Sequence, residues 1–142
     1  MKKMKASAAA AVVAVVGAAG LATSSTPAQA ATCYGEGESA YICEYGITER
    51  PLPDRSLEQF VIGTDKAVWT RYTKHGHWTA WETLNGIAQS QVFIESEYVG
   101  NPLGPFHTTI TVVGGDGKPW SRERTYFGGP WSPWARAIDP RP

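Results

Sequence analysis

Two tryptophan–arginine pairs are the side chains of this sequence best suited to binding a ligand. Trp69 and Arg71 lie two positions apart, as do Trp120 and Arg122, and residues two apart in a β-strand point to the same face. An aromatic ring can cover the flat C–H face of a sugar, while a guanidinium group offers a fork of donors. A tryptophan that recurs can instead pack one sheet on the next. We expect this core role for Trp69 and Trp120, with sugar binding as the alternative.

A second aromatic motif has the form Trp-x-x-Trp. It occurs as Trp78 and Trp81 and again as Trp131 and Trp134. In each motif we expect one ring to be buried and the other to be free for binding. Burial is expected for Trp81 and Trp134, so Trp78 and Trp131 join the sugar-binding candidates.

The other reactive side chains form no pattern that predicts catalysis. Asp65 and Asp116 would have to share a cleft to act as general acid and base, and their equivalent places indicate structural turn residues. His75 and His77 lie in a Gly-containing turn without the carboxylate partners of a metal site. The sequence has no nucleophile elbow and no phosphate-binding loop. We therefore expect no enzyme, no metal site and no cofactor.

These candidate residues recur because the chain contains an internal repeat of about fifty residues. Segments 61–71 and 112–122 are related by a shift of fifty-one residues, and five of their eleven positions are identical. The Trp-x-x-Trp motif returns at a shift of fifty-three residues, so two extra residues lie in the intervening turn. The ordered recurrence of Gly, Asp, Trp and Arg indicates two copies of one structural unit.

The hydrophobic pattern predicts that each copy consists of short antiparallel strands. Phe60 and Ile62 are expected on one face, and Asp65 is expected to bond to the backbone of its own turn. Gly and Pro punctuation argues against a helix after the first thirty residues, and Pro133 indicates an edge strand. The expected fold class is therefore all-β. The expected strands cover residues 59–63, 67–73, 78–84 and 91–99.

The sequence FVIGTDKAVWTR at 60–71, followed by WTAWE at 78–82, resembles the repeat of the PLL-like β-propeller family. This family is named after a fucose-binding bacterial lectin. The second copy is degraded, with Gly115 where the motif has Thr and Pro119 where it has an aliphatic residue. The resemblance implies two propeller-like antiparallel blades of about 51 residues. It also implies glycan pockets between neighbouring blades, for a ligand such as fucose or a methylated sugar.

Two blades are too few to close a propeller, whose closure is what removes exposed sheet edges. Either several copies assemble as a homo-oligomer that closes a ring, or segment 31–58 completes a smaller, open architecture. The expected fold is thus a partial or oligomer-completed β-propeller. Its parts are a signal peptide at 1–30, a disulfide-stapled segment at 31–58, a first repeat at 59–109 and a second, degraded repeat at 110–142.

The first thirty residues have the composition of a secretory signal peptide. Three lysines precede an apolar stretch at 6–22, and Ala28-Gln29-Ala30 has the small-residue pattern of a cleavage site. As a membrane anchor, the apolar stretch would be short and weakly hydrophobic. We therefore expect a secreted, extracellular product without membrane attachment. Cleavage leaves ten basic against thirteen acidic residues, and without clustered Lys or Arg we expect no nucleic-acid partner.

Cys33 and Cys43 are the only cysteines of the sequence. In an oxidising compartment they most simply form one local disulfide. Tyr34, Tyr41 and Tyr45 lie in the same segment, which suits a rigid contact surface. The sequence therefore leaves two functional hypotheses: a secreted, lectin-like carbohydrate-binding protein, and a secreted protein-interaction or inhibitor module that uses this segment.

Overall fold

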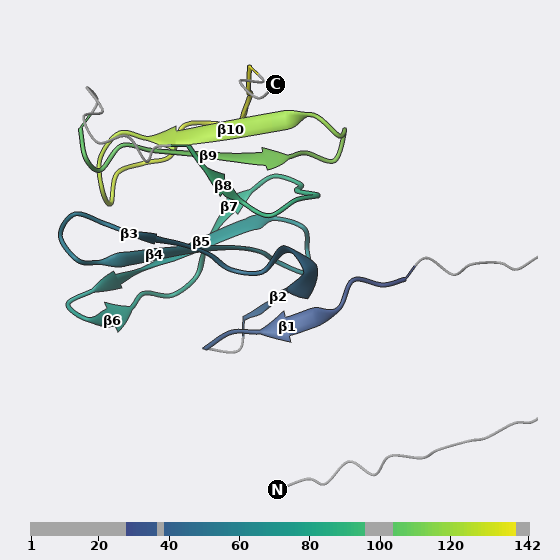
Figure 1. The fold of residues 1–142 in the computed structure, drawn as a ribbon, viewed down its shortest axis with the longest axis horizontal. Helices are drawn as coiled ribbons and strands as arrows, with labels where there is room; N and C mark the ends of the chain where they lie inside the picture. Colours follow the sequence, from purple (N-terminus) through teal and green to yellow (C-terminus); the bar gives the residue numbers. More distant parts are fainter. Residues whose placement is uncertain (1–27, 37–38, 96–103, 139–142) are drawn as a thin grey trace, which may run out of the picture.

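The computed structural model describes residues 28–36, 39–95 and 104–138, which form an all-β protein (Figure 1). The expected signal peptide lies outside the described residues up to position 27. Among the residues placed, the only helical element is a 3-10 turn at Cys43–Tyr45, and no helix is long and apolar enough to cross a membrane. The strands are β1 (Thr32–Tyr34), β2 (Ala40–Ile42), β3 (Thr48–Pro51), β4 (Leu57–Ile62), β5 (Val68–Lys74), β6 (His77–Trp78), β7 (Glu82–Asn85), β8 (Phe93–Ile94), β9 (Thr108–Val113), β10 (Pro119–Arg124) and β11 (Ala135–Arg136).

The strands form three antiparallel sheets, two of which repeat one topology. The first sheet has the order β3-β4-β5-β7, with the short β6 also paired to β5, and the second sheet has the order β8-β9-β10-β11. Trp69 on β5 pairs with Thr83 on β7, and Trp120 on β10 pairs with Arg136 on β11. The sequence repeat is therefore a structural repeat of a four-stranded sheet. Within the described ranges, the sheets do not close into a ring.

The strand boundaries differ from the sequence expectation at several places. The strand expected over 78–84 is divided into β6 and β7, because the Thr79 backbone and hydroxyl bond to the Tyr72 backbone. Pro133 lies in the loop before β11 rather than in a strand. β8 covers only the middle of the expected strand 91–99, the end of which lies outside the described residues. The first sheet includes β3, which precedes residue 59.

The hydrophobic core lies between the first and second sheets. Phe60 and Ile62 of β4 and Val68 of β5 pack with Ile110 and Val112 of β9 in one cluster. All five side chains are at most 3% exposed. The even spacing along β4 and β9 places each set on one face, as expected for Phe60 and Ile62. Figure 1 shows β9 and β10 as one layer against the layer of β3, β4 and β5.

A buried ion pair joins the two sheets beside this core. Arg124 of β10 donates from both terminal nitrogens to the two carboxylate oxygens of Glu58 on β4, each at 2.8 Å. Both side chains are at most 3% exposed. The guanidinium group also lies 4.7 Å from the centroid of the Trp131 ring. The bidentate geometry offsets part of the cost of removing both charges from water.

The outer face of the second sheet differs in composition from the equivalent face of the first. Thr111 stands where the first sheet has Phe60, and Glu123 stands where it has Tyr72. Side chains alternate along β9 and β10, so both residues point away from the first sheet. The Thr111 hydroxyl donates to Glu95 Oε1 at 2.6 Å. Thr111 is buried and pairs with Phe93 of β8 on this face, whereas Glu123 is exposed and places a charge there.

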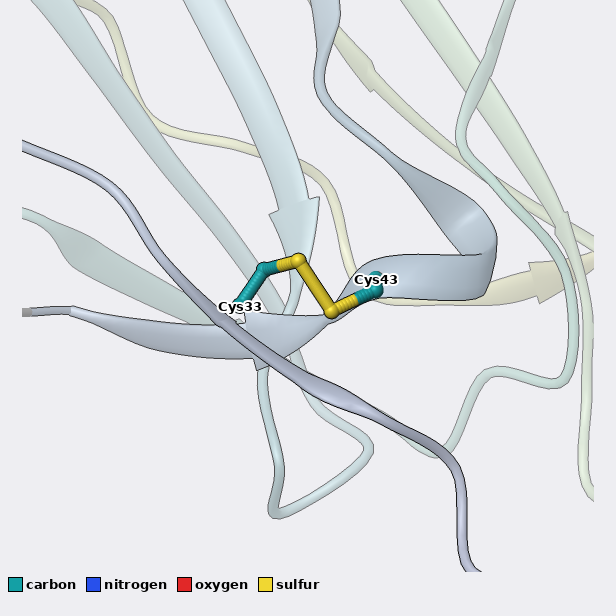
Figure 2. Close-up of a disulfide and its surroundings, with 2 residues drawn as sticks. All are labelled: Cys33 and Cys43. Carbon is teal, nitrogen blue, oxygen red and sulfur yellow. A yellow bond between two sulfur atoms is a disulfide. The ribbon is translucent and has the colours of Figure 1, made fainter.

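The third sheet is the hairpin of β1 and β2, which a disulfide closes (Figure 2). Cys33 on β1 is bonded to Cys43 at the start of the 3-10 turn, with the Cα atoms 5.0 Å apart, so the predicted pairing is confirmed. Tyr41 of β2 forms an antiparallel bridge with Gly63. Val61, which alternates with the core residues of β4, lines a pocket with β2. The hairpin therefore covers the face of the first sheet that points away from the second.

Candidate functional site

The turn after β4 holds an aspartate against a tryptophan. Asp65 Oδ1 accepts hydrogen bonds from the Ala67 backbone N–H at 3.0 Å and from Trp69 Nε1 at 3.1 Å. A side chain at Gly63 would place its Cβ only 2.5 Å from Asp65 Oδ1 and 2.7 Å from Trp69 Nε1. Glycine is therefore required here because the indole and the carboxylate lie directly over its backbone.

The turn after β9 repeats this arrangement. Asp116 Oδ1 accepts from the Lys118 backbone N–H at 3.0 Å and from Trp120 Nε1 at 3.1 Å. The bond from Trp120 is the main reason that the pKa of Asp116 lies below its usual value, with the Lys118 bond second. A Cβ at Gly114 would lie 2.5 Å from Trp120 Cδ1. The predicted turn role of the two aspartates is therefore what their hydrogen bonds show.

Each of these turns forms one wall of a pocket. The first, which we name the hairpin pocket, lies between the hairpin and the first sheet and has a volume of about 280 Å³. Its walls are Ser39, Ala40, Val61, Gly63, Thr64, Asp65, Trp69 and Trp81. The second, the inter-sheet pocket, lies between the first and second sheets and has a volume of about 430 Å³. Its walls are Val68, Gly86, Ile87, Val112, Gly114, Gly115, Asp116, Trp120 and Trp134.

The two pockets are equivalent under the repeat. Six wall positions of the hairpin pocket recur in the inter-sheet pocket at the shifts of fifty-one and fifty-three residues. The opposite walls also correspond, although their sequences are unrelated. Tyr41 bridges to Gly63, and Ala88 bridges to Gly114, so residues 39–40 occupy the place that residues 86–87 occupy in the other pocket. The recurring pairs are Val61 and Val112, Gly63 and Gly114, Thr64 and Gly115, Asp65 and Asp116, Trp69 and Trp120, and Trp81 and Trp134.

The predicted arginines fix the opposite walls rather than reaching into the pockets. Arg71 donates from Nη1 to the Glu36 carbonyl oxygen of the hairpin at 3.0 Å. Arg122 donates from Nη1 to the Leu84 carbonyl oxygen of the first sheet, and burial lowers the pKa of this guanidinium. A carbonyl of the hairpin therefore accepts from Arg71 of the first sheet, just as a carbonyl of the first sheet accepts from Arg122 of the second sheet.

The four rings of the Trp-x-x-Trp motifs are all half-buried. The ring centroids of Trp78 and Trp81 lie 4.4 and 4.6 Å from the Arg71 guanidinium, so both rings contact the same side chain. Trp81 and Trp134, for which burial was expected, instead line the two pockets. Their indole nitrogens differ in their hydrogen-bond partners. Trp134 Nε1 donates to the Leu84 carbonyl oxygen at 2.9 Å. The buried Trp81 Nε1 has no such partner in the described part of the chain.

Apart from Arg122, which is bonded to the Leu84 carbonyl oxygen, the sugar-binding candidates fall into three groups in the structure. Trp69 and Trp120 line the pockets, and Trp120 also packs against the core, as expected for its core role. Trp78 and Arg71 line a groove of about 600 Å³ beside the hairpin pocket. Trp131 packs edge-on against Phe60, with the centroids 6.0 Å apart, and lines neither pocket.

Sequence reasoning missed the opposite walls. Ser39, Ala40, Gly86 and Ile87 belong to no recognisable repeat, since the two segments share no pattern of letters. They are brought to equivalent places by backbone bridges and by the two arginine–carbonyl bonds, which depend on tertiary contacts. Trp81 and Trp134 also line the pockets without having been predicted to do so, but they could have been found from their recurrence in the Trp-x-x-Trp motif.

The remaining reactive side chains stay apart. Asp65 and Asp116 line different pockets, so they do not form the acid–base pair of one cleft. His75 and His77 are exposed, and His107 Nε2 lies 3.3 Å from Glu123 Oε2. In residues 28–36, 39–95 and 104–138, no group of three or more His, Cys, Asp or Glu side chains is placed to hold a metal ion.

Comparison with known proteins adds no relative. No protein-family model matches the chain, and no curated protein is significantly similar to it. The resemblance to the PLL-like repeat therefore stays a prediction that rests on the motif at 60–82. What the pockets bind has to be argued from their own geometry.

Proposed function

We propose that the protein is a lectin-like carbohydrate-binding protein without catalysis, which holds one sugar unit in each of the two pockets. The observation that carries this proposal is the recurrence of six wall positions around an open cavity at two places. A tryptophan needed for packing alone would be covered by the segment opposite it. Opposite Trp69 and Trp120, two unrelated segments both leave a pocket open and the ring half-buried.

Each pocket combines the groups that recognise a sugar. The indole of Trp69 or Trp120 offers an apolar surface for C–H groups, and the nearby carboxylate accepts hydrogen bonds from hydroxyls. The volume of about 430 Å³ lies in the lower part of the range of about 300–1,000 Å³ for small-molecule sites, and the volume of about 280 Å³ lies just below that range. Pockets of this size suit one monosaccharide unit, such as fucose or a methylated sugar.

We infer that the two sheets are propeller-like blades. Each is a four-stranded antiparallel sheet, which is the unit of a propeller, and the inter-sheet pocket lies where the PLL-like resemblance implies a glycan site. In this interpretation the hairpin takes the place of a preceding blade. The exposed Glu123 on the outer face of the second sheet favours a single copy over a ring of several copies, because another copy docked there would remove its carboxylate from water. A solution mass above that of one copy, measured by light scattering, would instead support ring closure.

We also propose that the protein is secreted. The Cys33–Cys43 disulfide is typical of oxidising compartments, and the first thirty residues have signal-peptide composition. N-terminal sequencing of the protein from culture medium tests this proposal. A chain that starts at Ala31 would support it, whereas retention of the whole chain in the cell would contradict it.

A glycan array followed by tryptophan-fluorescence titration tests sugar binding. We expect saturable changes with fucose or methylated sugars, and a flat response across the array would contradict the proposal. The double variant Asp65→Asn with Asp116→Asn keeps the side-chain shape but loses both charges. We expect it to bind roughly tenfold more weakly, as for one lost hydrogen bond to a charged group. Glu82→Gln is the matched control, because Glu82 is exposed and lines neither pocket.

One observation favours the second hypothesis, a protein-interaction or inhibitor module. Tyr34 on β1 is 73% exposed, and exposed tyrosines are common at protein interfaces. Pull-down from culture medium with the protein and with Tyr34→Ala tests this role. A partner that is lost with Tyr34→Ala, together with a flat glycan array, would favour it over sugar binding.

A further inference from the structure

The two aspartates of the pockets differ in what surrounds their second oxygen. In the inter-sheet pocket, Asp116 Oδ2 lies 3.1 Å from Nη2 of Arg136 on β11. The Arg136 guanidinium also lies 4.9 Å from the centroid of the Trp120 ring. In this pocket the second carboxylate oxygen therefore already accepts from a cation, in a pair whose side chains are 52% and 43% exposed.

In the hairpin pocket the position of this arginine belongs to a threonine. Thr83 pairs with Trp69 as Arg136 pairs with Trp120, and it is exposed. Within the part of the chain that the structure describes, Asp65 Oδ2 has only a long contact of 3.3 Å to Trp69 Nε1. Asp65 Oδ2 can therefore accept a hydrogen bond from a ligand without competition from a cation, whereas Asp116 Oδ2 already accepts one from Arg136 and has less capacity left.

Other wall residues add to this difference between the two pockets. The hairpin pocket is lined by Ser39 and Thr64, each of which carries a hydroxyl group. The equivalent positions of the inter-sheet pocket are Gly86 and Gly115, and Ile87, which is 61% exposed, stands where the hairpin pocket has Ala40. One pocket is thus walled by hydroxyls and a free carboxylate oxygen, and the other by an aliphatic side chain and glycine backbone.

From this asymmetry we propose that the two pockets select different sugars. The hairpin pocket binds the hydroxyl-rich edge of a sugar, with adjacent hydroxyls on Asp65 Oδ2 and Ser39. The inter-sheet pocket binds a sugar through a methyl group, as in a 6-deoxy or O-methyl sugar, with the methyl against Ile87 and Trp134. This inference rests on the proposed function, and it makes the disulfide-closed hairpin part of a binding site.

The indole N–H groups of Trp69 and Trp120 allow each pocket to be observed separately. Each N–H is bonded to the aspartate of its own pocket, so its ¹H–¹⁵N signal responds to a ligand there. The signals are assigned with Trp69→Phe and Trp120→Phe. The probes are pairs that differ at one position: L-galactose with its 6-deoxy form L-fucose, and D-glucose with 3-O-methyl-D-glucose. We expect the hydroxylated member to shift Trp69 more strongly and the methyl-bearing member to shift Trp120 more strongly.

Two reciprocal variants exchange the deciding residue. Thr83→Arg supplies Asp65 with the cation that Asp116 has, and we expect roughly tenfold weaker binding of the hydroxylated sugar at the hairpin pocket. Arg136→Thr frees Asp116 Oδ2, and we expect a similar gain for the hydroxylated sugar at the inter-sheet pocket. Both positions are exposed, so the fold is expected to tolerate the changes. Thr83→Met is the matched control, since it adds length without a charge.

The outcomes separate this inference from the proposed function. If both indole signals respond with the same preference, or if Thr83→Arg acts no differently from Thr83→Met, the selectivity is overturned while sugar binding stands. If neither signal responds to any probe or array hit, both proposals fall. Opposite preferences that the reciprocal variants exchange would establish the selectivity.

Discussion

The first sheet has two partners, the hairpin on one face and the second sheet on the other, and the two interfaces share one plan. In each, the backbone at a glycine bridges to the partner, as Gly63 does with Tyr41 and Gly114 does with Ala88. In each, an arginine two residues after the tryptophan donates to a carbonyl of the preceding unit. The repeat therefore carries its own docking contacts, and a two-stranded hairpin is sufficient to satisfy them.

The interfaces differ in what stabilises them. The inter-sheet interface has the apolar cluster and the buried Glu58–Arg124 pair. The hairpin has few side chains to bury, and its disulfide limits the conformations that it can adopt when unfolded. If the hairpin takes the place of a repeat unit, as we propose, its covalent bond supplies the order that a core would otherwise supply.

Among the changes that test the two interfaces, removal of the buried Glu58 carboxylate is expected to have the largest effect on stability. Glu58→Ala leaves Arg124 charged and unpaired between the sheets, and we expect a loss of about 3–5 kcal/mol in the free energy of unfolding. Urea denaturation measures it. Glu49→Ala, at an exposed glutamate on the neighbouring strand β3, should cost less than about 1 kcal/mol. Equal losses for the two variants would show that the pair does not stabilise the interface.

Removal of the disulfide is expected to act on the other interface. Cys33→Ser with Cys43→Ser should lower the free energy of unfolding by about 2–3 kcal/mol, the loop-entropy estimate for a short loop. The indole signal of Trp69 should shift or broaden because the hairpin pocket loses its wall, while that of Trp120 should stay. A change confined to Trp120 would contradict the assignment of the hairpin to the first sheet.

Addition of a methyl group at either bridging glycine tests whether the two interfaces are equivalent. Gly63→Ala and Gly114→Ala each place Cβ within 2.5 Å of a neighbouring atom, and overpacking of this kind costs about 1–3 kcal/mol. We expect a similar decrease in the melting temperature for both variants. Gly35→Ala is the control, because its Cβ would meet only Tyr41 at 3.8 Å. A loss at one site alone would show that the turns are not equivalent.

The smallest effect is expected in the turns themselves. Lys66 has a φ of 65° where the second copy has Gly117 with a φ of 72°. Lys66→Gly removes strain of about 1–2 kcal/mol but adds a glycine cost of about 0.5–1 kcal/mol. We therefore expect a small gain in the free energy of unfolding, below about 1 kcal/mol. Lys74→Gly, at the end of β5, should lose stability instead, and a loss at Lys66 as well would contradict the strain argument.

Much of the fold could be predicted from the sequence because its signals are local. The alternation around Phe60 and Ile62, the Asp turns and the recurrence of the motif all act over a few residues. The pairing of Cys33 with Cys43 followed from there being no other cysteine. The division of the strand expected at 78–84 could not be foreseen, since it depends on hydrogen bonds between Thr79 and Tyr72.

The candidate site was predicted only on one side. Trp69, Trp120 and the aspartates are in the repeat and could be found from it. The walls opposite them, such as Ser39 and Ile87, are set by how two units dock, and nothing in their own sequence marks them. Arg71 and Arg122 were correctly singled out as recurrent, but their partners are backbone carbonyls, which leave no trace in the order of side chains.

The polar outer face of the second sheet has a consequence for the behaviour of many copies together. A repeat that docks head to tail forms an open filament unless something stops it. Suppose that the outer face of β9 carried apolar side chains such as Phe60. The second sheet of one copy could then dock on the first sheet of another copy and displace the hairpin of that copy. Glu123 makes that exchange unfavourable because its exposed carboxylate would lose water. We therefore expect this exposed charge to limit filament growth at high protein concentration.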